Sequence, residues 1–164
     1  TTVSAGTLQI SNENNLGANP AAFNAAQLAV DGGTLRTAGS AVTLDDTNRG
    51  VTVGASGGTF ETATALTIAN AVAGSGTLTK TGASTLTLSG ANTHSGAVNV
   101  NSGTLAISGG SAIGNTSAVT VATGATFNLS AANETIGSLA GGGATILGTR
   151  TLTLGGDNTS TTWS

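Results

Sequence analysis

The chain has 164 residues and a net charge of −3, and only 7% of its residues are charged. Its four basic residues are scattered, which excludes nucleic-acid binding because phosphate neutralisation requires clustered Lys and Arg. The absence of Cys excludes disulfides and thiolate metal sites. No apolar run approaches the roughly 18 to 20 residues of a membrane span, so we expect no membrane insertion by this segment.

Short phrases of alternating apolar and small or polar residues recur along the whole chain. One set opens with Gly, usually followed by Thr, and occupies residues 6–10, 33–35, 58–60, 76–78, 103–107 and 124–129. A second set occupies residues 28–30, 42–44, 51–53, 66–68, 86–88, 98–100, 119–121 and 152–154. Period-two alternation rich in Val and Thr predicts short strands with one buried face. The Gly anchors recur at roughly the spacing of solenoid repeats, about 20 to 30 residues.

Helix signals are weak, because Gly or a β-branched residue interrupts most segments. The exception is the run from Asn19 to Ala26, where Asn19 could cap a helix and Pro20 suits its first position. We therefore expect at most one short helical turn, near residues 20–26.

These features predict an all-β fold, a right-handed parallel β-helix (β-solenoid) of about six to seven short coils. Strands this short, separated by Gly and Asn corners, suit stacked coils better than hairpins. An antiparallel β-sandwich is the alternative, and the irregular length of the coils is the main argument for it.

The middle of the chain carries the most specific pattern. Residues 78–82 read Leu-Thr-Lys-Thr-Gly, residues 86–93 read Leu-Thr-Leu-Ser-Gly-Ala-Asn-Thr, and residues 98–105 continue the alternation. This run resembles the autotransporter-associated β-strand repeat of bacterial passenger domains. His94 stands where that family commonly has Tyr, and Ser84 where it commonly has Gly. Residues 16–50 and 134–162 resemble the spacers between such repeats.

The resemblance implies a structural or adhesive stalk at the bacterial cell surface, outer-membrane-tethered or secreted, and not an enzyme. It implies that residues 1–164 form one β-solenoid segment of a longer repetitive passenger region. The implied partners are neighbouring repeats of the same chain and host-cell or matrix glycans or proteins. It transfers no catalytic residue, cofactor or metal ligand.

The densest polar cluster runs from Asp45 and Asp46 to Arg49. Paired carboxylates can bind Ca²⁺, or act as acid and base in a carbohydrate-active enzyme, with Asp31 as a further carboxylate. A glycan-binding module is the related alternative. We favour a solvated loop in which Asp and Asn are turn formers. Glu13, with its neighbouring Asn residues, predicts a second polar loop of the same kind.

Three further motifs have both a functional and a structural interpretation. His94, the single histidine, could serve a Ser-His-Asp triad, but it occupies a turn position. The glycines at 141–143 lack the Lys and the helix of a phosphate loop. Thr-x-Thr phrases at 77–79, 85–87 and 149–151 suggest ice binding by stacked threonines, although their spacing is irregular. We therefore predict no catalytic, cofactor-binding or metal-binding residue.

Overall fold

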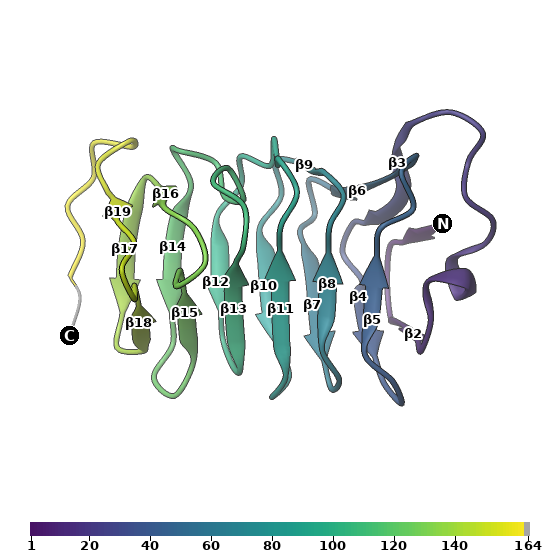
Figure 1. Ribbon diagram of the computed structural model, residues 1–164, viewed down its shortest axis with the longest axis horizontal. Coiled ribbons are helices and arrows are strands. Elements are labelled where there is room, and N and C mark those ends of the chain that lie inside the picture. Colours follow the sequence, from purple (N-terminus) through teal and green to yellow (C-terminus); the bar gives the residue numbers. More distant parts are fainter. Residues whose placement is uncertain (163–164) are drawn as a thin grey trace.

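The computed structural model describes residues 1–162 and is an elongated rod of stacked coils (Figure 1). Each described strand pair is parallel, including β2 with β4 and β10 with β12. The predicted β-solenoid is therefore confirmed, and the antiparallel sandwich is wrong. Among the described residues, no helix is long and apolar enough to cross a bilayer.

The coils align their strands into three main sheets that run along the rod. Sheet A contains β1 (Thr2–Val3), β3 (Asn24–Val30), β6 (Arg49–Val53) and β9 (Val72–Gly74). Sheet B contains β2 (Thr7–Ile10), β4 (Thr34–Thr37), β7 (Gly58–Thr62), β10 (Leu78–Thr81), β12 (Val98–Val100), β14 (Ala118–Val121) and β17 (Ser138–Gly141). Sheet C contains β5 (Val42–Leu44), β8 (Leu66–Ile68), β11 (Thr85–Leu88), β13 (Thr104–Ile107), β15 (Thr126–Asn128) and β18 (Ala144–Ile146). A further pair joins β16 (Glu134–Thr135) to β19 (Leu152–Thr153).

Alternation within each strand builds the core from narrow columns of stacked inward-facing side chains, with more than one column in sheet B and in sheet C. In sheet B, Leu35 stacks on Phe60 in the next coil, and further along the rod Val100 stacks on Val121. These four side chains are completely buried, while the residues that flank each of them along its own strand face outward. Burying an aliphatic or aromatic side chain of this size contributes about 1.5–3 kcal/mol, so the columns supply the main stabilisation of a chain with few large residues.

Coil length changes along the rod without disturbing strand register. Leu8 pairs with Leu35 and Leu35 pairs with Phe60, so the first two coils take 27 and 25 residues. From Phe60 onward the coils take 20 or 21 residues. Loops hold the difference, and the loop between η1 and β3 projects from the N-terminal end in Figure 1.

The helical turn lies earlier in the chain than predicted. It is a 3-10 helix, η1 (Glu13–Leu16), and the predicted position near residues 20–26 is wrong because β3 begins at Asn24. Asn12 and Asn15 form a capping box that fixes η1. Asn24 instead pairs with Arg49 of β6, so tertiary pairing overrides the local helix signal.

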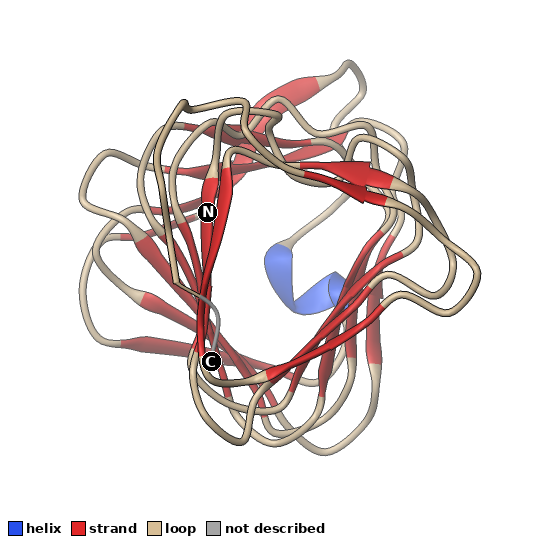
Figure 2. Ribbon diagram, turned by 90° about the vertical axis from the view of Figure 1, so that its left-hand side faces the viewer, coloured by secondary structure: helices blue, strands red, loops and turns tan. Residues whose placement is uncertain are grey.

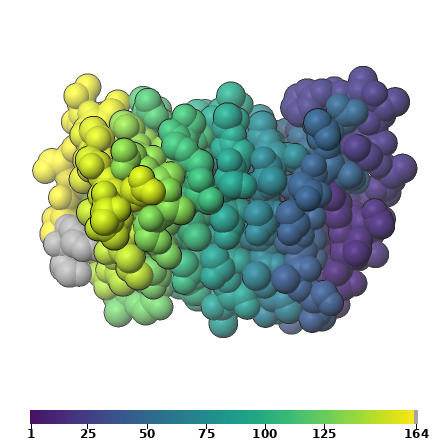
Figure 3. Space-filling view, viewed as in Figure 1, coloured from purple at the N-terminus to yellow at the C-terminus, as the bar shows by residue number. Residues whose placement is uncertain are grey.

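Viewed along the rod, the coils superpose as a three-sided outline with η1 inside it (Figure 2). Glycine makes one corner between sheets B and C possible: Gly82 has φ of 80°, and an added Cβ would lie 2.5 Å from the Thr62 carbonyl oxygen. The closely stacked coils give the continuous surface that is seen in Figure 3.

Candidate functional site

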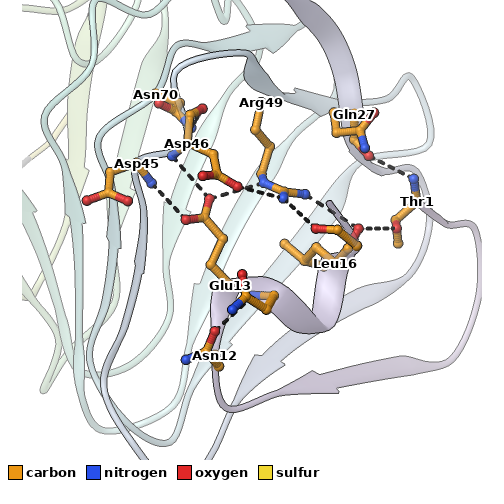
Figure 4. A network of polar contacts seen from close by, with 11 residues as sticks. Thr1, Asn12, Glu13, Leu16, Gln27, Asp45, Asp46, Arg49 and Asn70 are labelled. Atoms are coloured by element: carbon orange, nitrogen blue, oxygen red, sulfur yellow. Dashed lines mark hydrogen bonds and ion pairs between the residues drawn. The ribbon is translucent and has the colours of Figure 1, made fainter. Parts of the chain in front are cut away.

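The predicted polar cluster is a partly buried ion-pair network at the N-terminal end of the rod (Figure 4). Arg49 begins β6, and its side chain is completely buried. Its Nε lies 3.1 Å from Glu13 Oε1, and its Nη2 lies 2.9 Å from Asp46 Oδ2. Nη2 also donates to the Gly17 carbonyl at 2.9 Å, so Arg49 joins η1 to the loop that follows β5.

The two polar loops of the sequence therefore form one unit. The Glu13 carboxylate accepts from the backbone amides of Asp45 and Asp46 at 3.4 and 3.3 Å. Burial raises the pKa of Glu13, while these hydrogen bonds and Arg49 act in the opposite direction. The interpretation as a solvated loop is wrong for Arg49, although Asp45 is exposed as expected.

The arrangement does not match the one expected of a carbohydrate-active enzyme. Asp31 lies apart from the network and accepts from the Ser56 amide at 2.8 Å. Within residues 1–162, no group of three or more His, Asp and Glu side chains is placed to hold a metal ion. The carboxylates of Glu13 and Asp46 are committed to Arg49 and backbone amides.

Lys80, which is not among the residues predicted to be buried, occupies a core position. It follows Leu78 by two residues in β10, pairs with Phe60 on one side and Val100 on the other, and is completely buried. Its Nζ donates to the carbonyls of Thr81, Gly82 and Ser102 at 2.8, 2.8 and 2.9 Å. Burial lowers the pKa of Lys80 to about 8. The alternation with Leu78 was the signal that could have revealed its inward position.

Asn92 explains the Gly-Ala-Asn-Thr phrase of the repeat. Its Oδ1 accepts from the Val72 amide at 2.7 Å, and its Nδ2 donates to the Ala112 carbonyl at 2.8 Å. Val72 belongs to the coil before that of Asn92, and Ala112 belongs to the coil after it. The Asn92 side chain therefore connects three consecutive coils. In the next coil, Glu134 accepts from the Ala112 amide at 2.9 Å, and burial raises its pKa.

His94 is buried inside the coil rather than presented at a turn surface. It is 3% exposed, and its Nε2 lies 2.7 Å from the Gly76 carbonyl oxygen. Burial lowers the pKa of His94, and the contact with Gly76 partly opposes that change. The imidazole therefore contacts the backbone of a neighbouring coil, which is a structural role.

Hollows open at two glycine-rich corners of the described part of the rod. The first, of about 140 Å³, is lined by Gly57, Thr59, Thr77 and Thr79 among others. The second, of about 330 Å³, is formed by residues 124–126 and 142–144 and contains part of the predicted glycine run. No ionisable side chain lines either hollow, so we interpret both as shallow depressions between neighbouring coils.

The outer face of sheet B carries a ladder of aligned threonines. The register places one outward residue of each coil beside the next, in the order Thr7, Thr34, Thr59, Thr79, Asn99 and Thr120. We call these six residues the threonine ladder. The threonines are irregularly spaced along the sequence, but loops of different length absorb that irregularity and the side chains still align. Sheet C has shorter ladders: Thr43, Thr67 and Thr87 in one, and Thr85, Thr104 and Thr126 in the other.

The outer faces carry little charge because half of the basic residues are internal. Arg49 and Lys80 are completely buried. Arg36 lies beside the threonine ladder, and its Nε is 3.4 Å from Glu61 Oε1. The negative charge of Glu61 therefore balances the positive charge of Arg36 at this point of the surface. The surface therefore offers mainly hydroxyl, amide and small apolar groups.

Short parallel strands, aliphatic columns and outer faces with few charges define a repetitive structural β-solenoid. The family model described as passenger-associated-transport-repeat matches residues 1–10 and 78–107. The chain is similar to the "Adhesin BmaC autotransporter" of Brucella suis biovar 1 (strain 1330), with 37% identity over 143 residues. That match covers 82% of this chain and 4% of the relative, so the chain spans a small part of the length of the curated relative. No solved structure matches the chain.

The chain therefore contains the passenger repeat of bacterial autotransporters, and the predicted resemblance is confirmed. The matched residues 78–107 run from β10 through β13, and they include Lys80 and Asn92. The passenger repeat and the autotransporter relative also confirm the expected extracellular or cell-surface location.

Proposed function

We propose that this chain is a structural and adhesive segment of an autotransporter passenger. As a rod it would project other parts of a longer chain from the cell surface, and with neighbouring repeats it would form a continuous stalk. Residues 1–164 would then be one segment of that stalk. The similarity to an adhesin autotransporter and the passenger repeat support this role.

The observation that carries the adhesive part of the proposal is the threonine ladder. Aligned hydroxyl groups on a flat, nearly uncharged sheet can donate and accept hydrogen bonds over a long, shallow contact. Such a contact suits a glycan or an extended polar protein segment on a host cell or in its matrix. It does not suit a small molecule, which needs a concave pocket to be buried.

The test is binding of the purified chain to host cells and to arrays of matrix glycans and proteins. Thr59→Lys with Thr79→Lys places two long charged side chains on the ladder, and we expect binding to fall at least tenfold. The control is Ser130→Lys with Ala131→Lys, which adds the same charge at an exposed turn. Equal binding by both double variants and the wild type would remove the ladder from the proposal.

We also propose that the segment has no catalytic activity. The commitment of Glu13 and Asp46 to structural contacts supports this view. A panel of polysaccharides, assayed with the wild type and with Asp45→Ala and Asp46→Ala, tests it. Cleavage by the wild type that either substitution abolishes would contradict the proposal.

Ice binding is the second candidate function, and the threonine ladder is the observation that favours it. Four consecutive coils present Thr7, Thr34, Thr59 and Thr79 in direct register. The neighbouring outward column includes the Arg36–Glu61 pair, which breaks a second uniform ladder. Thermal hysteresis and ice-crystal shaping distinguish this function from adhesion, and absence of both would remove it.

A further inference from the structure

The hollow at residues 56–59 adjoins the threonine ladder. Thr59 and Thr79, which belong to the ladder, also line this hollow of about 140 Å³, together with Thr77, Ser56 and glycines from two successive corners. Gly57 has φ of 80°, so the corner requires a residue without a side chain, and the hollow lies where side chains would otherwise stand. The hollow therefore opens onto the outer face of sheet B and carries four hydroxyl groups.

A carboxylate stands beside this hollow. Asp31 directly precedes Gly32, a lining residue, and its Oδ1 accepts from the amide of Ser56 at 2.8 Å. Its side chain also packs against Gly54 of the next coil, where an added Cβ would meet the Asp31 carboxyl group. The carboxylate is half-buried, and among the described residues no basic side chain forms an ion pair with it. It can therefore accept further hydrogen bonds from a ligand.

The spacing of the ladder distinguishes two kinds of extended partner. Successive coils place Thr59, Thr79 and Asn99 about 4.8 Å apart, which is about the length of one sugar unit in a linear glycan. In an extended peptide, side chains on one face recur about every 7 Å, so a peptide that lies along the rod falls out of step with the coils. A linear glycan can repeat one contact at each coil, because each threonine offers a hydroxyl to the sugar hydroxyls and a methyl group to the C–H groups.

The charge on this face indicates a neutral glycan. Arg36 is the basic side chain that faces outward from sheet B, and Glu61 lies 3.4 Å from it, so the pair carries no net charge. Asp31 leaves the neighbourhood of the hollow with an unbalanced negative charge. A sulfated or sialylated glycan would be repelled there, whereas the hydroxyl groups of a neutral sugar can donate to the carboxylate.

We propose that this hollow is a subsite for one unit of a neutral linear glycan, in which Asp31 accepts from the sugar hydroxyls while the rest of the glycan lies along the threonine ladder. A shallow hollow does not bury a free monosaccharide, but it can seat one unit of a chain that the ladder holds. The hollow formed by residues 124–126 and 142–144 is lined by glycine, alanine and Thr126, so it offers a single hydroxyl group and is not assigned. This inference rests on the adhesive role proposed above and narrows its partner to one chemical class.

The test is binding of the 164-residue chain to an array of neutral, sulfated and sialylated glycans and of extended polar peptides. We expect the chain to bind neutral linear glycans, and to bind longer ones more tightly. Ser56→Leu fills the hollow, and Ala55→Leu is its matched control, because Ala55 is the adjacent exposed residue and does not line the hollow. Ser56→Leu should weaken this binding at least tenfold, whereas Ala55→Leu should bind like the wild type.

Asp31→Asn tests the carboxylate while it preserves the shape of the corner. The Asn side chain can still accept from the Ser56 amide, but one carboxylate oxygen becomes a donor and the charge is lost. Because hydrogen bonds to charged groups are the stronger ones, we expect binding of neutral glycans to fall about tenfold. Asp45→Asn removes the same charge from an exposed loop and should leave binding unchanged.

The outcomes separate the subsite from the adhesive role. Binding confined to acidic glycans or to peptides would overturn the assignment of the partner. If Thr59→Lys with Thr79→Lys abolishes glycan binding but Ser56→Leu and Asp31→Asn do not, the subsite is wrong and the ladder stands. Binding to host cells without binding to any neutral glycan would also overturn the subsite alone, whereas no binding to cells or arrays would remove the adhesive role with it.

Discussion

The first two coils and the passenger-repeat coils solve the same packing problem in different ways. Coils of 25 to 27 residues carry long loops, and an ion-pair network around Arg49 fixes those loops to the core. Coils of 20 or 21 residues have short corners, where Lys80 and Asn92 bond backbone carbonyls and amides of neighbouring coils. Both regions keep the same strand register.

The strand stack, and not the coil length, is therefore constant along this solenoid. Extra residues are tolerated where a loop leaves the rod, because loop length costs little free energy. The extra residues require a hydrogen-bond partner for each backbone N–H or C=O group that the loop leaves buried. In the N-terminal coils, side chains that are distant in sequence supply those partners, whereas in the repeat coils Lys80 and Asn92 of the repeat supply them.

The largest effect should come from the N-terminal network. Arg49→Ala leaves Glu13 and Asp46 without their cation in a partly buried site, so we expect a loss of about 4 kcal/mol in the free energy of unfolding. Arg36→Ala breaks an exposed pair and should cost less than about 1 kcal/mol. Denaturant unfolding of both variants measures the contrast, and equal losses would show that the network does not stabilise the long coils.

The repeat coils should respond to alkaline pH through Lys80. Its folded-state pKa of about 8 lies below the ordinary value of 10.5, so between these values the unfolded chain binds a proton that the folded chain does not. Stability should therefore rise as the pH increases from 8 to 10.5, by about 3 kcal/mol. Lys80 is the single lysine, and the chain has no Tyr or Cys, so few other groups titrate there. Lys80→Met should abolish the rise; a similar pH dependence in that variant would assign it to other groups.

Corner glycines should differ between tight and open corners. Gly82 and Gly124 have φ of 80° and 84°, but an added Cβ at Gly82 would meet the Thr62 backbone, whereas at Gly124 it would meet nothing within 4 Å. We expect Gly82→Ala to cost about 3 kcal/mol and Gly124→Ala about 1 kcal/mol. Thermal unfolding of the two variants gives the ranking, and the reverse order would contradict the close stacking of the repeat coils.

The smallest effect should come from His94 at mildly acidic pH. Because burial lowers its folded-state pKa below the value of 6.5 in the unfolded chain, stability should fall as the pH decreases through 6.5. The raised pKa values of Glu13 and Glu134 act in the opposite direction at lower pH. His94→Gln should therefore flatten the stability profile around pH 6, and an unchanged profile would show that His94 is not its source.

Local alternation predicted most of the strands, because in a phrase such as Thr104–Ile107 the alternating residues mark the buried and exposed faces. It did not predict β9, β17 or β18, where small residues and glycine replace part of the pattern. Contacts between distant loops could not be predicted in this way: Glu13 and Arg49 are 36 residues apart, and no local pattern joins them. The predicted helical turn failed because strand pairing at Asn24 outweighs propensity. The threonine ladder was missed because unequal coil lengths hide alignment that only register reveals.

The fold depends on coils that stack in parallel register along one axis. Spin labels on the threonine ladder test it directly, because the chain has no native Cys to compete for labelling. Labels at Thr34 and Asn99 are separated by three coil steps, and labels at Thr7 and Thr120 by five. At about 4.8 Å per step, the second pair should be about 10 Å farther apart than the first. Equal distances, or a shorter distance for the second pair, would contradict the stacking.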